Sequence, residues 1–164
     1  MLVVSDTSPL NYLILIDAQH VLPALYDAVL VPTQVIEELR REKAPERVRG
    51  WANHLPAWVV VQAGDASRFP ALNYGEAAAL AMALDAHARL LVDEADARST
   101  ADALGVLTIG TIGILAEAHL KSLLDFDATI QTLSTTTFRV HANVFASARS
   151  QILVRQPGYG RKGD

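Results

Sequence analysis

Five short apolar runs punctuate the first two thirds of the chain, and more polar segments separate them. In chain order they are LVVS (2–5), AVLVP (28–32), AWVVVQ (57–62), RLLVD (89–93) and VLTIG (106–110). The runs are apolar nearly throughout instead of alternating with polar residues, which is typical of strands that are covered on both faces. The pattern therefore predicts five buried strands.

Segments with helical character lie between these runs. Residues 8–27 begin with Ser8 and Pro9, a capping residue followed by a proline suited to a first helical turn. Residues 74–87 are rich in alanine and leucine, which are strong helix formers. Further helices are expected at 33–42, 95–104 and 111–121. The alternation predicts an α/β fold in which helices cover both sides of a parallel sheet.

The last forty residues are less regular. Residues 124–140 begin as a helix, and their end, TTTFRV, suits either a loop or an edge strand. Residues 141–153 again have helical character, and the glycine-rich, charged end at 157–164 is expected to be disordered. No linker or internal repeat divides the remainder, so we expect a single domain over residues 1–156.

Composition narrows the class of protein. The 164 residues are 51% hydrophobic and 20% charged, enough to bury a core. There is no cysteine, which excludes disulfides and thiolate chemistry and suits a reducing compartment. No apolar run approaches the roughly 20 residues of a membrane span, and no basic segment precedes the first run as in a signal peptide. We expect a soluble, cytoplasmic protein without a membrane partner.

Charge leaves two interpretations of the basic and aromatic residues open. The formal net charge of −4 argues against a generally basic nucleic-acid binder, but a cation held by carboxylates would bring its own positive charge to a nuclease. Basic residues are concentrated at 40–49 and in the tail, where Arg155, Arg161 and Lys162 lie. They form either a solvated face and a frayed end or a rim that contacts phosphates. Three aromatic residues serve either packing or base stacking: Trp51, Trp58 and Tyr74. The five histidines show no metal-ligand spacing.

Acidic residues follow the predicted strands. Ligand sites of parallel α/β sheets gather at the carboxyl ends of the strands, and the acids near those ends are Asp6, Glu38, Glu76, Asp93, Glu94 and Asp96. Carboxylates held close together repel one another unless a cation is present, and Mg²⁺ prefers oxygen ligands. The pattern favours metal-assisted phosphodiester chemistry. The alternative is that acids near helix starts only complement the helix dipole.

Several motifs occur together in the order and spacing of one family. They are VVSDTSPLNYL (3–13), VPTQVIEELRR (31–41), LNYGEAAALAMAL (72–84), LLVDEADAR (90–98) and GVLTIGTIGIL (105–115). Over about residues 1–124 the chain resembles the PIN-domain family. In particular it resembles the small prokaryotic branch of this family with a GEA helix, which is similar to VapC-type toxin ribonucleases.

This resemblance implies a fold, an activity and partners. The fold is a three-layer α/β/α sandwich around a central parallel sheet. The activity is Mg²⁺- or Mn²⁺-dependent cleavage of single-stranded or structured RNA, leaving a 5′-phosphate and a 3′-hydroxyl. The implied partner besides RNA is an antitoxin whose C-terminal segment covers the acidic cleft. Apolar segments at 109–115 and 76–88 would in addition support a homodimer.

The resemblance also assigns roles to residues. Asp6 takes the place of the first metal-binding acid, and the hydroxyls of Thr7 and Ser8 would orient it. Glu38 takes the second place, ahead of its neighbour Glu37. Glu76 takes the third, where many family members have aspartate.

The fourth acid is ambiguous. The slot that the toxin pattern usually gives to aspartate holds Ala95 here, so we expect Asp93 in this role, with Glu94 and Asp96 as substitutes. Further expected site residues are Asn11, which would hydrogen-bond the acids or cap a helix, and Arg98, which would contact phosphate, a site carboxylate or a surface acid. A turn that contains Gly110 and Thr111 would bring backbone amides near the site.

Two other functions compete with the nuclease. A phosphotransferase that uses Asp6 as nucleophile would usually have a second acid two residues on, where this chain has Ser8. A catalytically weak PIN-like module would bind RNA or a protein partner without cutting, and Ala95 favours this alternative.

Overall fold

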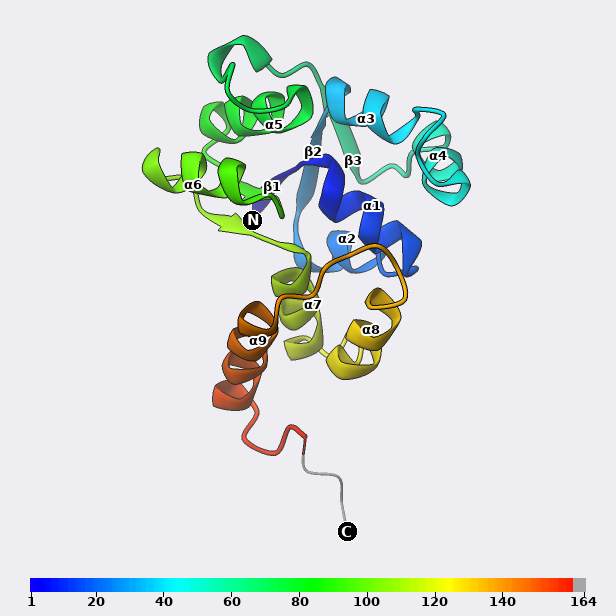
Figure 1. Ribbon diagram of the computed structural model, residues 1–164, viewed down its shortest axis with the longest axis vertical. Helices are drawn as coiled ribbons and strands as arrows, with labels where there is room; N and C mark the ends of the chain where they lie inside the picture. Colours follow the sequence, from blue (N-terminus) through cyan, green and yellow to red (C-terminus); the bar gives the residue numbers. More distant parts are fainter. Residues whose placement is uncertain (161–164) are drawn as a thin grey trace. The chain divides into compact units, whose positions relative to one another are not determined.

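The computed structural model describes residues 1–160, and its first compact unit, Met1–Thr111, is built on a five-stranded sheet (Figure 1). The strand order is β3-β2-β1-β4-β5, and every neighbouring pair is parallel. The strands are β1 (Leu2–Ser5), β2 (Ala28–Pro32), β3 (Val59–Gln62), β4 (Arg89–Leu91) and β5 (Thr108–Ile109). All five predicted strands are present, and the parallel α/β sheet is confirmed.

Helices cover both faces of this sheet. They are α1 (Thr7–Leu15), α2 (Val21–Leu25), α3 (Thr33–Leu39), α4 (Glu46–Asn53), the 3₁₀ turn η1 (Ala66–Arg68), α5 (Tyr74–Asp85) and α6 (Ala95–Ala103). Val4, Leu30 and Leu90 form a buried core with α5 and α6. Because successive strand residues face opposite ways, the buried Val3 and Val29 turn away from α5 and α6. Helices α1 to α4 lie on the other side of the sheet from α5 and α6 (Figure 1). This arrangement is the three-layer sandwich that was expected.

The expected helix at 8–27 is in fact two helices. Asp17 adopts a left-handed backbone conformation with φ of 59°. The amide of Asp17 donates to the carbonyl of Ile14 (3.1 Å) and that of Ala18 to Leu13 (2.8 Å), which ends α1 in a Schellman motif. The prediction was wrong here because aspartate, and not glycine, occupies the left-handed position.

Helix α4 was not predicted, and it gives part of the basic stretch a structural role. The Arg40 Nε atom donates to the Ala52 carbonyl oxygen at 2.9 Å, and Arg47 forms a 2.7 Å ion pair with Asp17. Arg41 is exposed. At least two of the basic side chains at 40–49 therefore hold neighbouring elements together.

The second compact unit, Ile112–Asp164, is helical over its described residues. Its helices are α7 (Thr111–Leu120), which begins at the last residue of the first unit, α8 (Phe126–Leu133) and α9 (Ala142–Arg155). Phe126 stacks on Phe145 with ring centroids 5.8 Å apart. Residues 135–140, for which a loop or an edge strand was expected, are turn and coil and therefore form a loop. Of the end expected to be disordered, 157–160 form a turn in which Tyr159 contacts His119, and 161–164 lie outside the described residues.

Two expectations about surfaces can be compared with burial. The segments expected to support a homodimer are largely buried within the chain: Ala77 to Ala83 are at most 6% exposed, and Ile114 and Leu115 are fully buried. A homodimer would have to use another surface. Along residues 1–160, no helix is both long and apolar enough to cross a membrane.

Candidate functional site

The topology places a ligand site between β1 and β4. From β1 the chain moves outward to β2 and β3 on one side, then returns to form β4 and β5 on the other. In open parallel sheets, ligands bind at the carboxyl ends of the strands where the connections diverge in this way. Asp6 follows β1 directly, and Asp93 lies just beyond β4. The amide of Asp6 donates to the Leu91 carbonyl oxygen at 3.0 Å, which ties the two strand ends together.

Asp6 is a buried carboxyl group with an unsatisfied oxygen. Its side chain is 3% exposed, and Oδ1 has no hydrogen-bond partner among the described residues. Burial raises the pKa of Asp6 from 3.8 to about 7; the Thr7 amide opposes this shift, and the charges of Glu76, Glu38 and Asp93 add to it. A buried carboxylate is costly unless it is paired. Its unpaired oxygen therefore marks a place where a cation would be stabilised.

Glu38 reaches the same region from the second turn of α3. Thr7 Oγ1 donates a hydrogen bond to its Oε2 atom. Its Oε1 atom lies 2.8 Å from the position that a Cβ atom on Gly75 would occupy. A larger residue at position 75 would therefore force this carboxylate to shift away from the first turn of α5. This contact brings α1, α3 and α5 together at one point.

Glu76 is fixed by the start of α5. Its amide donates to Asn73 Oδ1 at 2.9 Å, and its Oε2 atom accepts from the Asn73 amide at 3.4 Å, which forms a capping box. Burial raises the pKa of Glu76; the Asn73 amide opposes this shift, and the neighbouring charges of Glu94 and Glu38 add to it. Glu76 thus combines the capping role with a place in the acidic cluster.

Asp93 is held by three hydrogen bonds. Ser8 Oγ donates to Oδ2 at 3.0 Å, Thr111 Oγ1 donates to Oδ2 at 2.7 Å, and the Thr111 amide donates to Oδ1 at 2.7 Å. A Cβ atom on Gly110 would lie 2.9 Å from both Asp93 Oδ1 and Arg98 Nη1. The turn at 110–111 therefore does bring an amide to the site, and its glycine gives two side chains the space to approach.

The remaining expected residues take varied positions. The hydroxyls of Thr7 and Ser8 bind Glu38 and Asp93 and do not orient Asp6, which corrects the expectation. Arg98 Nη1 donates to the Val92 carbonyl oxygen at 3.3 Å, beside the cluster. The positions of the others follow: Asn11 is half-buried on α1, Glu37 is exposed on α3, Glu94 is exposed just before α6, and Asp96 is exposed in the first turn of α6.

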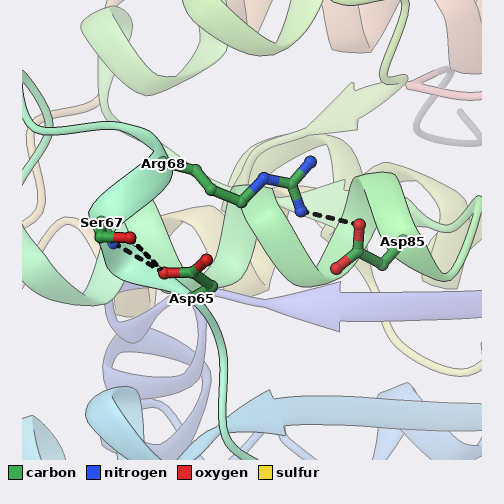
Figure 2. A network of polar contacts seen from close by, with 4 residues as sticks. All are labelled: Asp65, Ser67, Arg68 and Asp85. Carbon is green, nitrogen blue, oxygen red and sulfur yellow. Dashed lines mark hydrogen bonds and ion pairs between the residues drawn. The ribbon is translucent and has the colours of Figure 1, made fainter.

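Sequence reasoning missed the contacts that position α5. Gln34 Nε2 donates to the Gly64 carbonyl oxygen at 2.6 Å, and a side chain on Gly64 would collide with the Ala78 backbone. Farther along the loop, Asp65 accepts from the amide and hydroxyl of Ser67 (Figure 2). Arg68 pairs with Asp85 of α5 at 2.7 Å (Figure 2). These contacts anchor the loop that leads into α5.

The donor chemistry of the acidic cluster suits a hard divalent cation, although the side chains do not converge fully. As they stand, no group of three His, Cys, Asp or Glu side chains within residues 1–160 could hold one metal ion. The available atoms are carboxylate oxygens, which Mg²⁺ prefers, and the unpartnered Oδ1 of Asp6 is among them. The residues present therefore fit such an ion in chemical type.

Comparison with known proteins identifies the family of this chain. A family model described as a PIN domain matches residues 2–153. The chain belongs to the PIN-domain family, and membership indicates a nuclease-type function in general. PIN domains generally use divalent metal ions and bind RNA. No curated protein and no solved structure matches the chain significantly.

Proposed function

We propose that this chain is a divalent-metal-dependent endoribonuclease that hydrolyses RNA phosphodiester bonds in the cytoplasm. The observation that supports the proposal best is the buried carboxyl group of Asp6, whose Oδ1 atom has no hydrogen-bond partner among the described residues and which feels the charges of Glu38, Glu76 and Asp93. Four acids from separate elements would serve as catalytic and metal-binding residues: Asp6, Glu38, Glu76 and Asp93.

The ion and the residues around it would have different roles in the reaction. A bound Mg²⁺ or Mn²⁺ ion would supply polarisation of the scissile phosphate and a water molecule of lowered pKa. Asp6 offers the free oxygen for that ion, and Thr7 fixes the second acid through its hydrogen bond to Glu38. The free NH groups of Arg98 would contact a phosphate of the RNA.

The three candidates for the fourth acid, Asp93, Glu94 and Asp96, differ in their surroundings. Asp93 already accepts three hydrogen bonds, so its main contribution would be to hold β1, β4 and the start of α7 in register. Glu94 is exposed and its charge acts on Glu76, which favours it as a second free carboxylate. Asp96 is exposed in the first turn of α6 and would at most bind an outer water.

The same hydrogen bonds favour one alternative function. If Asp93, which already accepts three hydrogen bonds, does not bind an ion, and Ala95 offers no carboxylate, the chain could be a PIN-like module that binds RNA or a protein without cutting. The nuclease remains the better proposal, because simple binding of RNA or protein does not require a buried Asp6 whose Oδ1 atom lacks a partner and whose neighbours are acids.

Cleavage of a labelled single-stranded RNA in Mg²⁺ or Mn²⁺ tests the proposal. The wild type should cut, EDTA should stop it, and Asp6→Asn should lower the rate at least about 100-fold. Asp102→Asn is the matched control, because it removes an exposed carboxylate at the far end of α6 and should cut normally. Equal cleavage by wild type and Asp6→Asn would reject the assigned site. RNA binding without cleavage would favour the module.

A toxin role in a toxin–antitoxin pair rests on the resemblance to VapC-type toxins. Induced expression of the wild type should then arrest bacterial growth, and Asp6→Asn should not. Growth arrest by both variants would show that toxicity does not depend on the proposed chemistry.

A further inference from the structure

One aromatic side chain stands exposed beside the acidic cluster. Trp51 and Trp58 contact each other, with ring centroids 6.0 Å apart. Tyr74, in contrast, is 56% exposed and is the first residue of α5. It therefore differs from the two tryptophans in presenting a large aromatic surface to solvent.

The backbone fixes Tyr74 close to the acids. The next residue, Gly75, lies against the carboxylate of Glu38, and the one after it is Glu76. With about 3.8 Å between successive Cα atoms, the Tyr74 Cα lies within about 8 Å of Glu38 Oε1. The capping box at Asn73 holds this first turn in place. A tyrosine side chain has only two χ angles, so it loses little conformational freedom when it binds a ligand.

Beside an acidic site, an uncharged contact is the favourable way to hold a nucleic acid. The surrounding carboxylates repel the phosphates of a nucleic acid, and the chain as a whole carries a net charge of −4. Stacking between a base and an aromatic ring is free of that repulsion. The bases of an A-form duplex are already stacked on one another, so only an unpaired nucleotide can offer a face to the ring.

We propose that Tyr74 is a positioning residue that stacks on the base of an unpaired nucleotide next to the scissile phosphate. This inference rests on the proposed nuclease function and adds a residue that positions the RNA beside the acids. The ring holds the chain of nucleotides so that one phosphate lies over the acids.

Steady-state cleavage of a 12-nucleotide single-stranded RNA tests the role. Tyr74→Ala should raise KM about 10- to 100-fold and leave kcat within about threefold. Tyr74→Phe and Tyr74→Trp should keep a KM near that of the wild type, because both retain an aromatic face. Leu107→Ala is the control, because it removes an exposed apolar side chain at the amino end of β5, the opposite edge of the sheet.

A second readout does not depend on cleavage. Single-stranded RNA that carries 5-iodouridine should photocrosslink to the wild type in Ca²⁺, and mass spectrometry should place the crosslink at Tyr74. A wild-type KM for Tyr74→Ala, a failure of Tyr74→Phe to restore it, a crosslink elsewhere, or no binding of the RNA would each overturn the stacking role. If the wild type crosslinks at Tyr74 but cleaves nothing, the stacking role stands and the nuclease proposal fails.

Discussion

Replacing Asp6 with asparagine should stabilise the metal-free protein at alkaline pH. Asp6 is 3% exposed, and burial raises its pKa from 3.8 to about 7. Because the folded state holds the proton more tightly than the unfolded state, stability is lost as the pH rises from about 4 to 7. Asparagine cannot ionise, so the variant escapes this loss.

The size of the effect follows from the shift. At 1.36 kcal/mol per pKa unit, ionised Asp6 lowers the free energy of unfolding by at most about 4 kcal/mol at pH 8. Between pH 5 and pH 8 the wild type should lose about 2 to 3 kcal/mol relative to Asp6→Asn. Most of this advantage of the variant should vanish near pH 4.

Urea unfolding in EDTA, followed by tryptophan fluorescence at several pH values, measures both proteins. Asp102→Asn is again the control and should follow the wild type. Added Mn²⁺ should stabilise the wild type at pH 8, where Asp6 is ionised, and should have little effect on Asp6→Asn. If the curves of wild type and Asp6→Asn run parallel from pH 5 to pH 8, the raised pKa and the reasoning built on it are refuted.

Three further substitutions test how the cluster is held. Gly75→Ala should cut RNA at least about 10-fold more slowly, because the new Cβ would displace the Glu38 carboxylate; its urea stability should change by less than about 1 kcal/mol, because alanine favours the helix. Unchanged cleavage would show that this close approach is unimportant. Thr111→Val should lower the free energy of unfolding by about 2 kcal/mol, since Asp93 loses a charge-assisted hydrogen bond, whereas Thr111→Ser should not; equal stabilities would contradict this. Asn73→Ala should cost about 1 kcal/mol in urea unfolding through loss of the capping box, and a value near zero would mean that the cap contributes nothing.

The sequence predicted strands and helix starts better than helix ends. β1 and β2 occupy the residues expected because each apolar run stops sharply, at Asp6 and at Thr33. The break between α1 and α2 depends on Asp17, which has a left-handed backbone conformation. A glycine at this position would have predicted the helix end, but an aspartate did not. Helix α4 was not predicted, because its charged residues were interpreted as a solvated face or a phosphate-contacting rim and not as part of a helix.

For the site, the sequence singled out acids near strand ends and helix starts, but it did not predict the contacts that hold them. Strand ends and helix starts are local features, so the positions of Asp6 and Asp93 could be inferred from the pattern. The hydrogen bonds from Thr7 to Glu38 and from Ser8 to Asp93 join residues 31 and 85 positions apart. The need for glycine at position 75 likewise arises only when α3 meets α5 in space.

The most direct test of the central claim is the anomalous signal from a crystal soaked in Mn²⁺. The claim is that carboxylates from separate elements share one cation at the carboxyl edge of the sheet. The account predicts a peak within bonding distance of Asp6 Oδ1 and of at least one oxygen of Glu38, Glu76 or Glu94. A wild-type crystal that shows no peak there at millimolar Mn²⁺, or peaks only elsewhere on the protein, would contradict it.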